Sequence, residues 1–308
     1  MLTAKKASYL RGRMFRVTKV SSTGVPIYGD ESQMVSKGFV NISSTTNSEE
    51  GEAITLTNAA GEFCINETAT PQFSGIGLEI QFCEVDPAIF TALTGQAPIL
   101  DPVSGDAIGY KVETGVDLSA VSFALEVWMN AKSAATPNVN SQGLFGYLLL
   151  PFLQGGTIGD FTIENAAITF TVTGIVSKDG AGWGSGPYKV QLGAGDLPVL
   201  LSDPVSSREH FRKIFVEVAP PADFIGARPV LDPTDPAVTS VTDTPTGLSV
   251  AFAPTPVGTD PMWYEFGDGT WDYAETGSYT HVYPAAGTYD WVAYRGTSRV
   301  TGQVTVTA

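Results

Sequence analysis

The stretch from Phe73 to Gly95 constrains the fold most, because its hydrophobic period changes partway along it. Asp86 and Pro87 begin a helix, since a carboxylate caps the first free N–H groups and proline suits the first turn. This helix spans only about two turns before Gly95, so we expect it to pack on a sheet. Before it, apolar residues occupy alternate positions, which predicts a strand with one buried face: Ile76, Leu78, Ile80 and Phe82.

The composition favours a β-rich protein with a sizeable core. Of the 308 residues, 43% are hydrophobic and 16% are charged, and 33 glycines and 20 prolines supply many turns. The net charge of −15 argues against a protein that grips nucleic acid, because phosphate binding needs lysine and arginine. Such acidity suits a surface that DNA slides past without adhering.

The N-terminus is basic but lacks the features of a secretion signal. Residues 1–19 include no acidic residue, yet they contain no apolar run of the ~7–15 residues found in signal peptides. The longest apolar run, Leu144–Leu153, is about half as long as a membrane-spanning helix. We therefore expect a soluble protein without a targeting signal or membrane contact.

Several other segments of the first 220 residues are predicted to be strands. The glycine-rich loop Ser177–Pro187 is expected to be a flexible hairpin tip that exposes Trp183, and Asn47–Gly51 a polar turn of a long hairpin. Roughly eight or nine strands flanked by one helix predict an all-β sandwich or barrel. Besides the strand that precedes the helix, these strands are Val35–Thr46, Glu52–Thr57, Phe63–Thr70, Val121–Asn130, Leu144–Leu153 (buried on both faces), Ile158–Val172, Tyr188–Leu192 and Phe211–Val218.

The residues that usually carry chemistry are scarce. Cys64 and Cys83 could pair if their strands were neighbours, but we favour two buried free thiols, as is usual in the cytosol. His210 and His281 are the only histidines, which excludes a His-rich metal site. No nucleotide loop or nucleophile motif occurs. We predict no catalytic residue, metal or cofactor, and no enzyme; turn residues explain the candidate calcium ligands Asp260, Asp268 and Asp272.

A proline-rich segment, Ala219–Pro236, divides the chain. It is expected to be stiff, extended and unable to enter a sheet interior. We therefore predict a first domain of residues 1–229 and a second, small domain of residues 230–308. Few contacts are expected across such a boundary.

The second domain carries three short motifs in order: WYEFGDGT at 263–270, HVY at 281–283 and GTY at 287–289. Asp-Gly within the first is a two-residue hairpin signal, because glycine adopts positive φ freely. The tyrosine of the third is placed as a tyrosine corner. The set resembles the PKD type of immunoglobulin-like domain, which implies structural roles for Trp263, Phe266, Gly267, Asp268, Gly269, His281, Tyr283, Gly287 and Tyr289.

The organisation of the whole chain resembles the major tail protein of long-tailed bacteriophages, the subunit of the tail tube. The shared features are the basic terminus, the acidic-tipped hairpin, the DPAIFTALTG helix, the proline-rich linker and the appended immunoglobulin-like domain. The resemblance implies hexameric rings, stacked into a tube through which double-stranded DNA passes without specific binding. It also implies contacts with tape-measure, tail-terminator and baseplate proteins, and a place in the virion tail after assembly in the host cytoplasm.

Two sets of residues are candidates for roles in such a tube. A terminal segment and a hairpin tip that cannot bury themselves are natural contacts between rings: Lys5, Lys6, Arg11, Arg13, Glu49, Glu50 and Glu52. The channel wall is expected to be acidic or neutral, so that DNA is not arrested. Its candidates come from the polar faces of two strands, although the sequence does not say which strands face inward: Glu79, Gln81, Glu126 and Asn130.

The alternative function is that of a secreted or surface protein that adheres or binds polysaccharide, since PKD-like modules are spacers on many unrelated proteins. That function predicts a signal peptide and a cluster of exposed aromatic residues. The sequence shows no recognisable signal, and Trp183 is the only aromatic residue predicted to be exposed in a loop.

Overall fold

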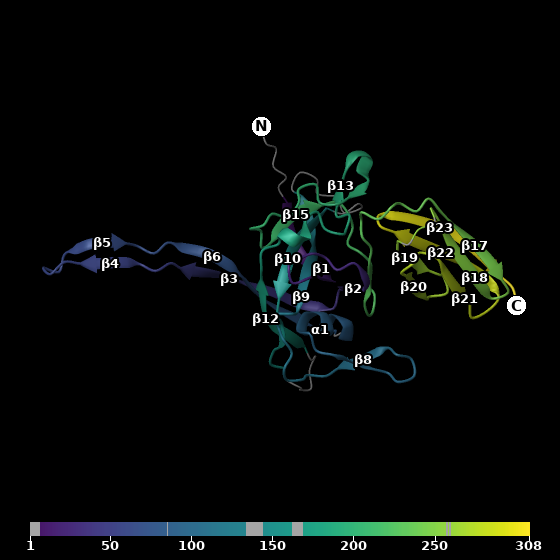
Figure 1. Ribbon diagram of the computed structural model, residues 1–308, viewed down its shortest axis with the longest axis horizontal. Helices are drawn as coiled ribbons and strands as arrows, with labels where there is room; N and C mark the ends of the chain where they lie inside the picture. Colours follow the sequence, from purple (N-terminus) through teal and green to yellow (C-terminus); the bar gives the residue numbers. More distant parts are fainter. Residues whose placement is uncertain (1–6, 85, 134–143, 162–168, 257, 259) are drawn as a thin grey trace.

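The computed structural model describes residues 7–84, 86–133, 144–161, 169–256, 258 and 260–308, and antiparallel β-sheet dominates it (Figure 1). The predicted all-β class is confirmed. The described part has one α-helix, α1 (Pro87–Thr94), and short 3-10 helices at Ala181–Trp183 and Ala194–Asp196. The strands of the first domain are β1 (Ala7–Lys19), β2 (Gly29–Ser36), β3 (Phe39–Glu50), β4 (Ile54–Thr57), β5 (Phe63–Glu67), β6 (Pro71–Phe82), β7 (Pro98–Leu100), β8 (Ala107–Tyr110), β9 (Ser122–Ser133), β10 (Phe145–Gln154), β11 (Thr157–Ile158), β12 (Phe170–Ser177), β13 (Gln191–Leu192), β14 (Pro198–Val199), β15 (Arg212–Val216) and β16 (Arg228–Val230).

The predicted strand-to-helix junction is confirmed. The Asp86 carboxylate accepts a hydrogen bond from the N–H of Ala88 at 2.9 Å, and Gly95 ends α1 with a φ of 69°. A Cβ added at Gly95 would lie 2.6 Å from Cγ2 of Val121, so glycine is required there for space as well as for φ. The helix packs into the core through Ile89 and Leu93.

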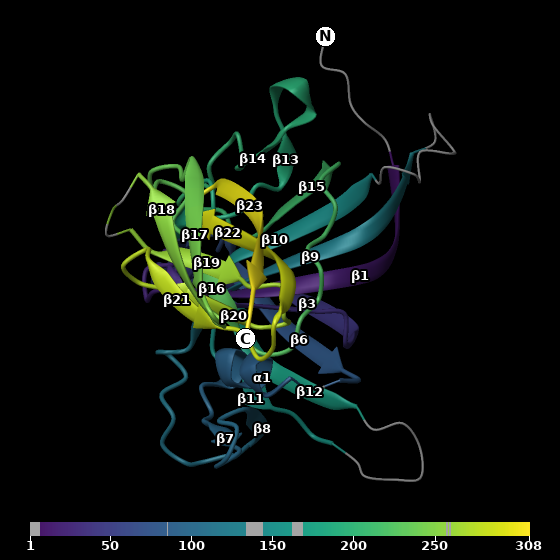
Figure 2. The same ribbon diagram turned by 90° about the vertical axis from the view of Figure 1, so that its right-hand side faces the viewer.

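The main sheet folds into two layers. Its strand order is β16-β2-β1-β9-β10-β12-β6-β3, and β10 and β12 share only two residue pairs (Figure 2). Across the fold, the ring of Phe15 on β1 lies 5.6 Å from that of Phe39 on β3 and 5.8 Å from that of Phe82 on β6. The two ends of the sheet therefore face each other around one core, as in a β-sandwich.

β9, β10 and the second half of β1, from Met14 to Thr18, are buried on both faces, which confirms the prediction for Leu144–Leu153. One face contributes to the core beneath α1, and the other is covered by the chain that follows β12. Trp183 in that covering segment is only 3% exposed, so the prediction of an exposed hairpin tip is wrong. Glycine is needed here for close packing, because a Cβ at Gly182 would lie 2.3 Å from the carbonyl oxygen of Thr23.

Other predicted boundaries are also wrong. The strand expected at Val35–Thr46 is broken between β2 and β3, because the Ser36 hydroxyl accepts from the N–H of Gly38 and closes a turn. The turn expected at Asn47–Gly51 is mostly a continuation of β3. Ile158–Val172 spans the end of β11 and the start of β12, and residues 162–168 lie outside the described part.

Residues 240–306 form a second, smaller sandwich. Its core includes Phe252, Tyr264, Phe266 and Trp291. The sheet orders are β17-β18-β21 and β20-β19-β22-β23, an immunoglobulin-like arrangement that agrees with the predicted fold class. The strands are β17 (Ser240–Thr246), β18 (Ser249–Thr255), β19 (Met262–Glu265), β20 (Trp271–Ala274), β21 (Tyr279–Val282), β22 (Gly287–Arg295) and β23 (Ser298–Val306).

The FGDG motif forms a longer loop than the two-residue hairpin predicted for it. Glu265 pairs with Trp271, so residues 266–270 form the connection. A Cβ at Gly267 would lie 2.1 Å from the carbonyl oxygen of Asp290, and its φ is 81°. The loop therefore packs against β22, which is why it needs a glycine there.

The remaining motif residues hold this loop in place. The Asp268 carboxylate accepts from the N–H of Thr270 at 2.9 Å and lies 2.8 Å from Nε2 of His281. Burial opposes ionisation of Asp268, but the hydrogen bonds from Thr270 and His281 outweigh it and lower the pKa of the carboxyl. The Tyr283 hydroxyl donates to the carbonyl of Phe266 at 3.1 Å.

The predicted tyrosine corner is confirmed. The Tyr289 hydroxyl donates to the carbonyl of Ala285 at 3.0 Å, and its ring stacks on Tyr283. Trp263 packs its ring on Tyr294, at a centroid distance of 5.0 Å. Gly287 begins β22, and a Cβ there would make only ordinary contact with the ring of Tyr289, at 3.4 Å. Among the described residues, no group of His, Cys, Asp or Glu side chains is arranged to hold a metal ion.

Candidate self-association surfaces

Beyond the sandwich, β3 and β6 continue as a hairpin that projects from the first domain (Figure 1). We call residues 47–74 the arm; β4 and β5 form its outer part, and every residue in it except Ala69 is exposed. At ~3.3 Å per residue, the arm reaches roughly 35–40 Å from its root. The Asn58 side chain closes its tip by accepting from the N–H groups of Ala60 and Glu62, both at 2.9 Å.

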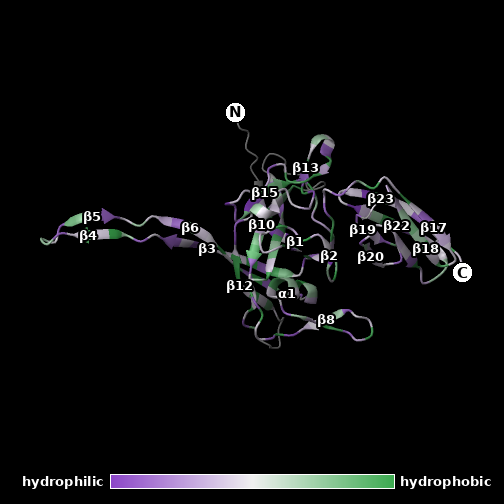
Figure 3. Ribbon diagram, in the orientation of Figure 1, coloured by the Kyte–Doolittle hydropathy of each residue, from purple (hydrophilic) through white to green (hydrophobic). Residues whose placement is uncertain are grey.

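Both strands of the outer arm carry hydrophobic residues (Figure 3), and three of them lie on one face. Leu56 pairs with Ile65, and Ile54 pairs with Glu67, so these four side chains share a face. Leu56 is 56% exposed and Ile65 is 47% exposed. Because an isolated two-stranded hairpin is at best marginally stable in water, this face is expected to need a covering surface.

The arm is also uniformly acidic. No lysine, arginine or histidine occurs between Gly38 and Tyr110. The predicted contact residues Glu49, Glu50 and Glu52 are all exposed at or just beyond the end of β3. They form no ion pair within the described part of the chain.

The basic N-terminal segment is not the free terminal arm that the sequence suggested. From Ala7 onward it forms β1, which pairs with β9. Arg11 and Arg13 are exposed on this strand, and the guanidinium of Arg13 lies 5.6 Å from the ring centre of Phe145. Lys5 and Lys6 lie outside the described residues.

The root of the arm is fixed by residues that the sequence analysis missed. The hydroxyl of Ser177 accepts from the N–H of Ile76 at 2.8 Å and lies 2.9 Å from Nδ1 of His210. The His210 ring packs edge-on against Phe73 at 5.0 Å. Asp179 lies 3.4 Å from Nε2 of His210. Ser177 itself is buried, and its hydroxyl is engaged by the main-chain N–H of Ile76. These groups therefore position the arm, and no local sequence signal pointed to them.

Two of the four candidate channel residues lie together on a polar outer surface. Glu79 pairs with Ser43 and is exposed, and Gln81 pairs with Asn41 and Thr171. The Gln81 amide donates to the hydroxyl of Thr169 at 3.0 Å. The strands of this layer, β3, β6 and β12, contain no lysine or arginine.

Glu126 cannot line a channel, because it is fully buried. Its carboxylate accepts from Nε and Nη2 of Arg16 at 2.6 and 2.7 Å, and from the Tyr147 hydroxyl at 2.6 Å. Arg16 stands directly opposite Glu126 on the neighbouring strand, with its guanidinium over the ring of Tyr188. Burial disfavours the charged guanidinium, but the charge and hydrogen bond of Glu126, together with the nearby Tyr188 and Tyr147, outweigh this and raise the pKa of Arg16. Asn130, half-buried on β9, does not join Glu79 and Gln81.

The proline-rich segment contacts both domains. Its strand β16 pairs with the edge of β2. The Arg228 guanidinium lies 4.3 Å from the ring centre of Phe224 and 5.5 Å from that of Trp263, and 3.5 Å from a carboxylate oxygen of Glu265. These contacts join the linker to the face of β19.

Both cysteines are free thiols, as predicted, but neither is buried. Cys64 lies on the arm, where both strand faces meet solvent. Cys83 follows β6, and its thiol donates to the carbonyl of Gly38 at 3.4 Å. The predicted burial is wrong for both thiols, and for Cys64 the reason is that the arm has no second layer.

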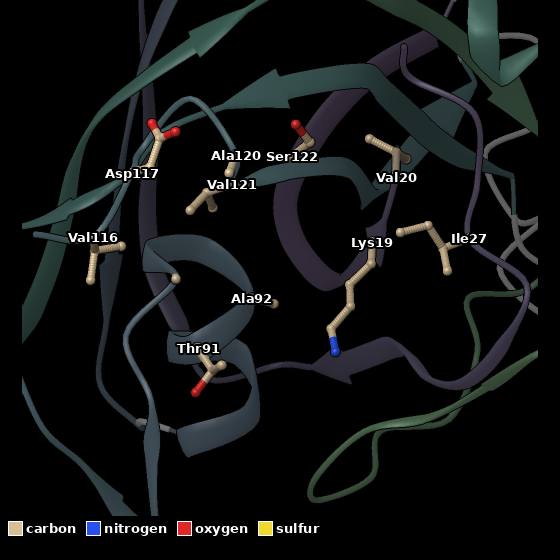
Figure 4. Close-up of a pocket in the computed structure, with 11 residues that line it drawn as sticks. Lys19, Val20, Ile27, Thr91, Ala92, Val116, Asp117, Ala120, Val121 and Ser122 are labelled. Atoms are coloured by element: carbon tan, nitrogen blue, oxygen red, sulfur yellow. The ribbon is translucent and has the colours of Figure 1, made fainter. Parts of the chain in front are cut away.

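A groove with a volume of about 480 Å³ lies beside α1 (Figure 4). Lys19 extends along it toward the helix, and Asp117 lies at its other side. The hydroxyls of Thr91 and Ser122 are buried there and have no hydrogen-bond partner among the described residues. The apolar part of its lining comes from Val20, Ile27, Ala92, Val116, Ala120 and Val121.

Comparisons with known proteins add no assignment. No family model matches the chain, and a search of curated proteins finds no significant match. None of the helices in the described ranges is long and apolar enough to span a bilayer. The functional argument therefore depends on the surfaces described above.

Proposed function

We propose that this chain is a structural, non-enzymatic protein that self-associates into rings, which stack into the tail tube of a long-tailed bacteriophage. The observation that carries the proposal is the arm: a long acidic hairpin with an uncovered apolar face. Such an element gains stability only by docking on another molecule. A second copy is the simplest partner, because a ring of identical subunits also satisfies exposed sheet edges.

The polar outer surface of β12, β6 and β3 supports a channel role for that layer. It presents Glu79, Gln81 and hydroxyl-bearing side chains without any cation in its strands. DNA phosphates would find no lysine or arginine there to bind, so the polymer would slide past. In this proposal the wall of the tube is built from that layer, and Glu126 contributes only to the core.

The C-terminal sandwich is proposed to be displayed on the outside of the tube. Arg228 and β16 would hold it at a defined angle in every subunit. Hexameric symmetry, contacts with tape-measure, tail-terminator and baseplate proteins, and location in the virion tail come from the resemblance and belong to the same proposal.

Electron microscopy of the purified protein tests this function. We expect rings or tubes with a central pore. The variant Leu56→Thr/Ile65→Thr, which keeps β propensity but removes apolar area from the arm, should lose them. The matched control Val103→Thr/Ile108→Thr changes two other exposed apolar residues on the β7–β8 hairpin and should assemble normally. Monodisperse monomers of the unmodified protein at all concentrations would refute the proposal.

A further inference from the structure

We propose that the groove beside α1 receives the arm of a second copy, with Glu67 of the arm paired to Lys19 of the groove. The inference rests on the proposed self-association and goes further by naming both contact surfaces. It depends on two features of the groove: its exposed apolar residues and the ammonium group of Lys19.

The groove is built to accept aliphatic side chains. Gly95 at the end of α1 lets Val116 and Val121 close in, since a Cβ there would lie 3.1 Å from the first and 2.6 Å from the second. Ile27 on the opposite wall is 43% exposed. Val20, Ala92 and Val121 are buried, so the apolar surface that stays uncovered at the groove belongs mainly to Ile27, Val116 and Ala120.

The charges of the two surfaces are complementary. The arm presents Ile54, Leu56 and Ile65 beside one carboxylate, that of Glu67, on the same face. The groove presents aliphatic walls beside one ammonium group, that of Lys19, which makes no ion pair among the described residues. Because the Asp117 carboxylate lies at the other side of the groove, Glu67 has to lie at the Lys19 side, where the two charges have opposite sign.

The positions of the two surfaces favour a chain of subunits over a closed pair. The arm leaves one side of the first domain, and β2, which follows the loop bearing Ile27, lies on the other side (Figure 1). A contact between different patches is heterologous, and it generates a ring or an open filament, whereas a self-complementary patch gives a dimer.

Disulfide trapping tests the contact directly. In a Cys64→Ser/Cys83→Ser background, Ile65→Cys combined with Ile27→Cys should give a ladder of covalent oligomers under oxidation. Ile65→Cys combined with Val103→Cys, a fully exposed position outside the groove, should give no ladder. Rings or tubes that form without the first ladder would overturn the groove assignment alone. The absence of any assembly would overturn the proposed function with it.

A charge exchange provides the second test. Lys19→Glu and Glu67→Lys should each raise the critical concentration for assembly by roughly tenfold or more, because like charges then face each other. The double variant should recover most of the loss, which also shows that each substitution leaves the chain folded. Lys178→Glu, at an exposed site away from the groove, should change nothing. Unaltered assembly of Lys19→Glu, as expected if the groove holds a small molecule, would refute the pairing.

Discussion

Replacing Glu126 with alanine distinguishes a core residue from a channel residue. The side chain is fully buried and accepts three hydrogen bonds, two from Arg16 and one from Tyr147. Alanine at this position leaves the Arg16 guanidinium charged, buried and without its counterion. It also removes the acceptor of the Tyr147 hydroxyl.

The expected loss follows from these contacts. Removing one partner of a buried ion pair costs about 3–5 kcal/mol, mostly through the charge left behind. For a domain of this size, 1 kcal/mol corresponds to roughly 2–4 °C, so the unfolding midpoint should fall by roughly 6–20 °C. Glu79→Ala, at an exposed position, should stay within about 0.5 kcal/mol of the parent.

Thermal and urea unfolding, followed by fluorescence, would measure the loss. Trp128 lies 5.1 Å from the Arg16 guanidinium and reports on the first domain. The double variant Arg16→Met/Glu126→Leu removes both charges and should recover much of the stability. A Glu126→Ala protein within about 1 kcal/mol of the parent would refute the argument that this pair is desolvated.

Three further predictions concern the C-terminal sandwich. Burial, together with the hydrogen bond to Asp272, raises the pKa of Tyr279 to about 12. An unfolded tyrosine titrates at ~10, so the stability contributed by the protonated side chain should be complete below pH ~10 and fall between pH ~10 and ~12. Alkaline denaturation of the parent and of Tyr279→Phe would measure this loss. Gly267→Ala should destabilise this domain more than Gly269→Ala in urea unfolding, because both positions have positive φ but only the first places a Cβ against backbone. Arg228→Ala should broaden the orientations of the domain in small-angle scattering, whereas Arg208→Ala, an exposed residue, should not; equal scattering from both variants would show that Arg228 does not hold it.

Signals that lie within one element were predicted well. Asp86, Pro87 and Gly95 define α1 through contacts with their immediate neighbours, and the tyrosine corner at Tyr289 spans only four residues. The continuous apolar run of β10 likewise predicts that the strand is buried on both faces, and it is.

Features that depend on distant residues were not predictable in the same way. Glu126 occupies a polar position in an alternating pattern that is typical of a half-exposed strand. It can be buried because Arg16, 110 positions earlier, pairs with its carboxylate. Trp183 lies among glycines that suggest a mobile tip, yet those glycines allow close packing against Thr23. The arm shows the reverse error, because Glu52–Thr57 and Phe63–Thr70 were predicted as strands of the sandwich or barrel, whereas they extend beyond it and have no second layer.

The attachment of the C-terminal sandwich has a mechanical consequence. β16 meets β2 through only two register pairs, Arg228 with Gln33 and Val230 with Gly29, and through one bond from the Gln33 amide to the carbonyl of Pro229 at 2.7 Å. β1 and β9, by contrast, are paired along most of their lengths. A tensile force applied to the C-terminal domain would therefore peel β16 away first, and each freed residue would lengthen the tether by up to ~3.5 Å. The sandwich of the first domain would bear little of that load, so shear on the outer domain would be absorbed in the linker.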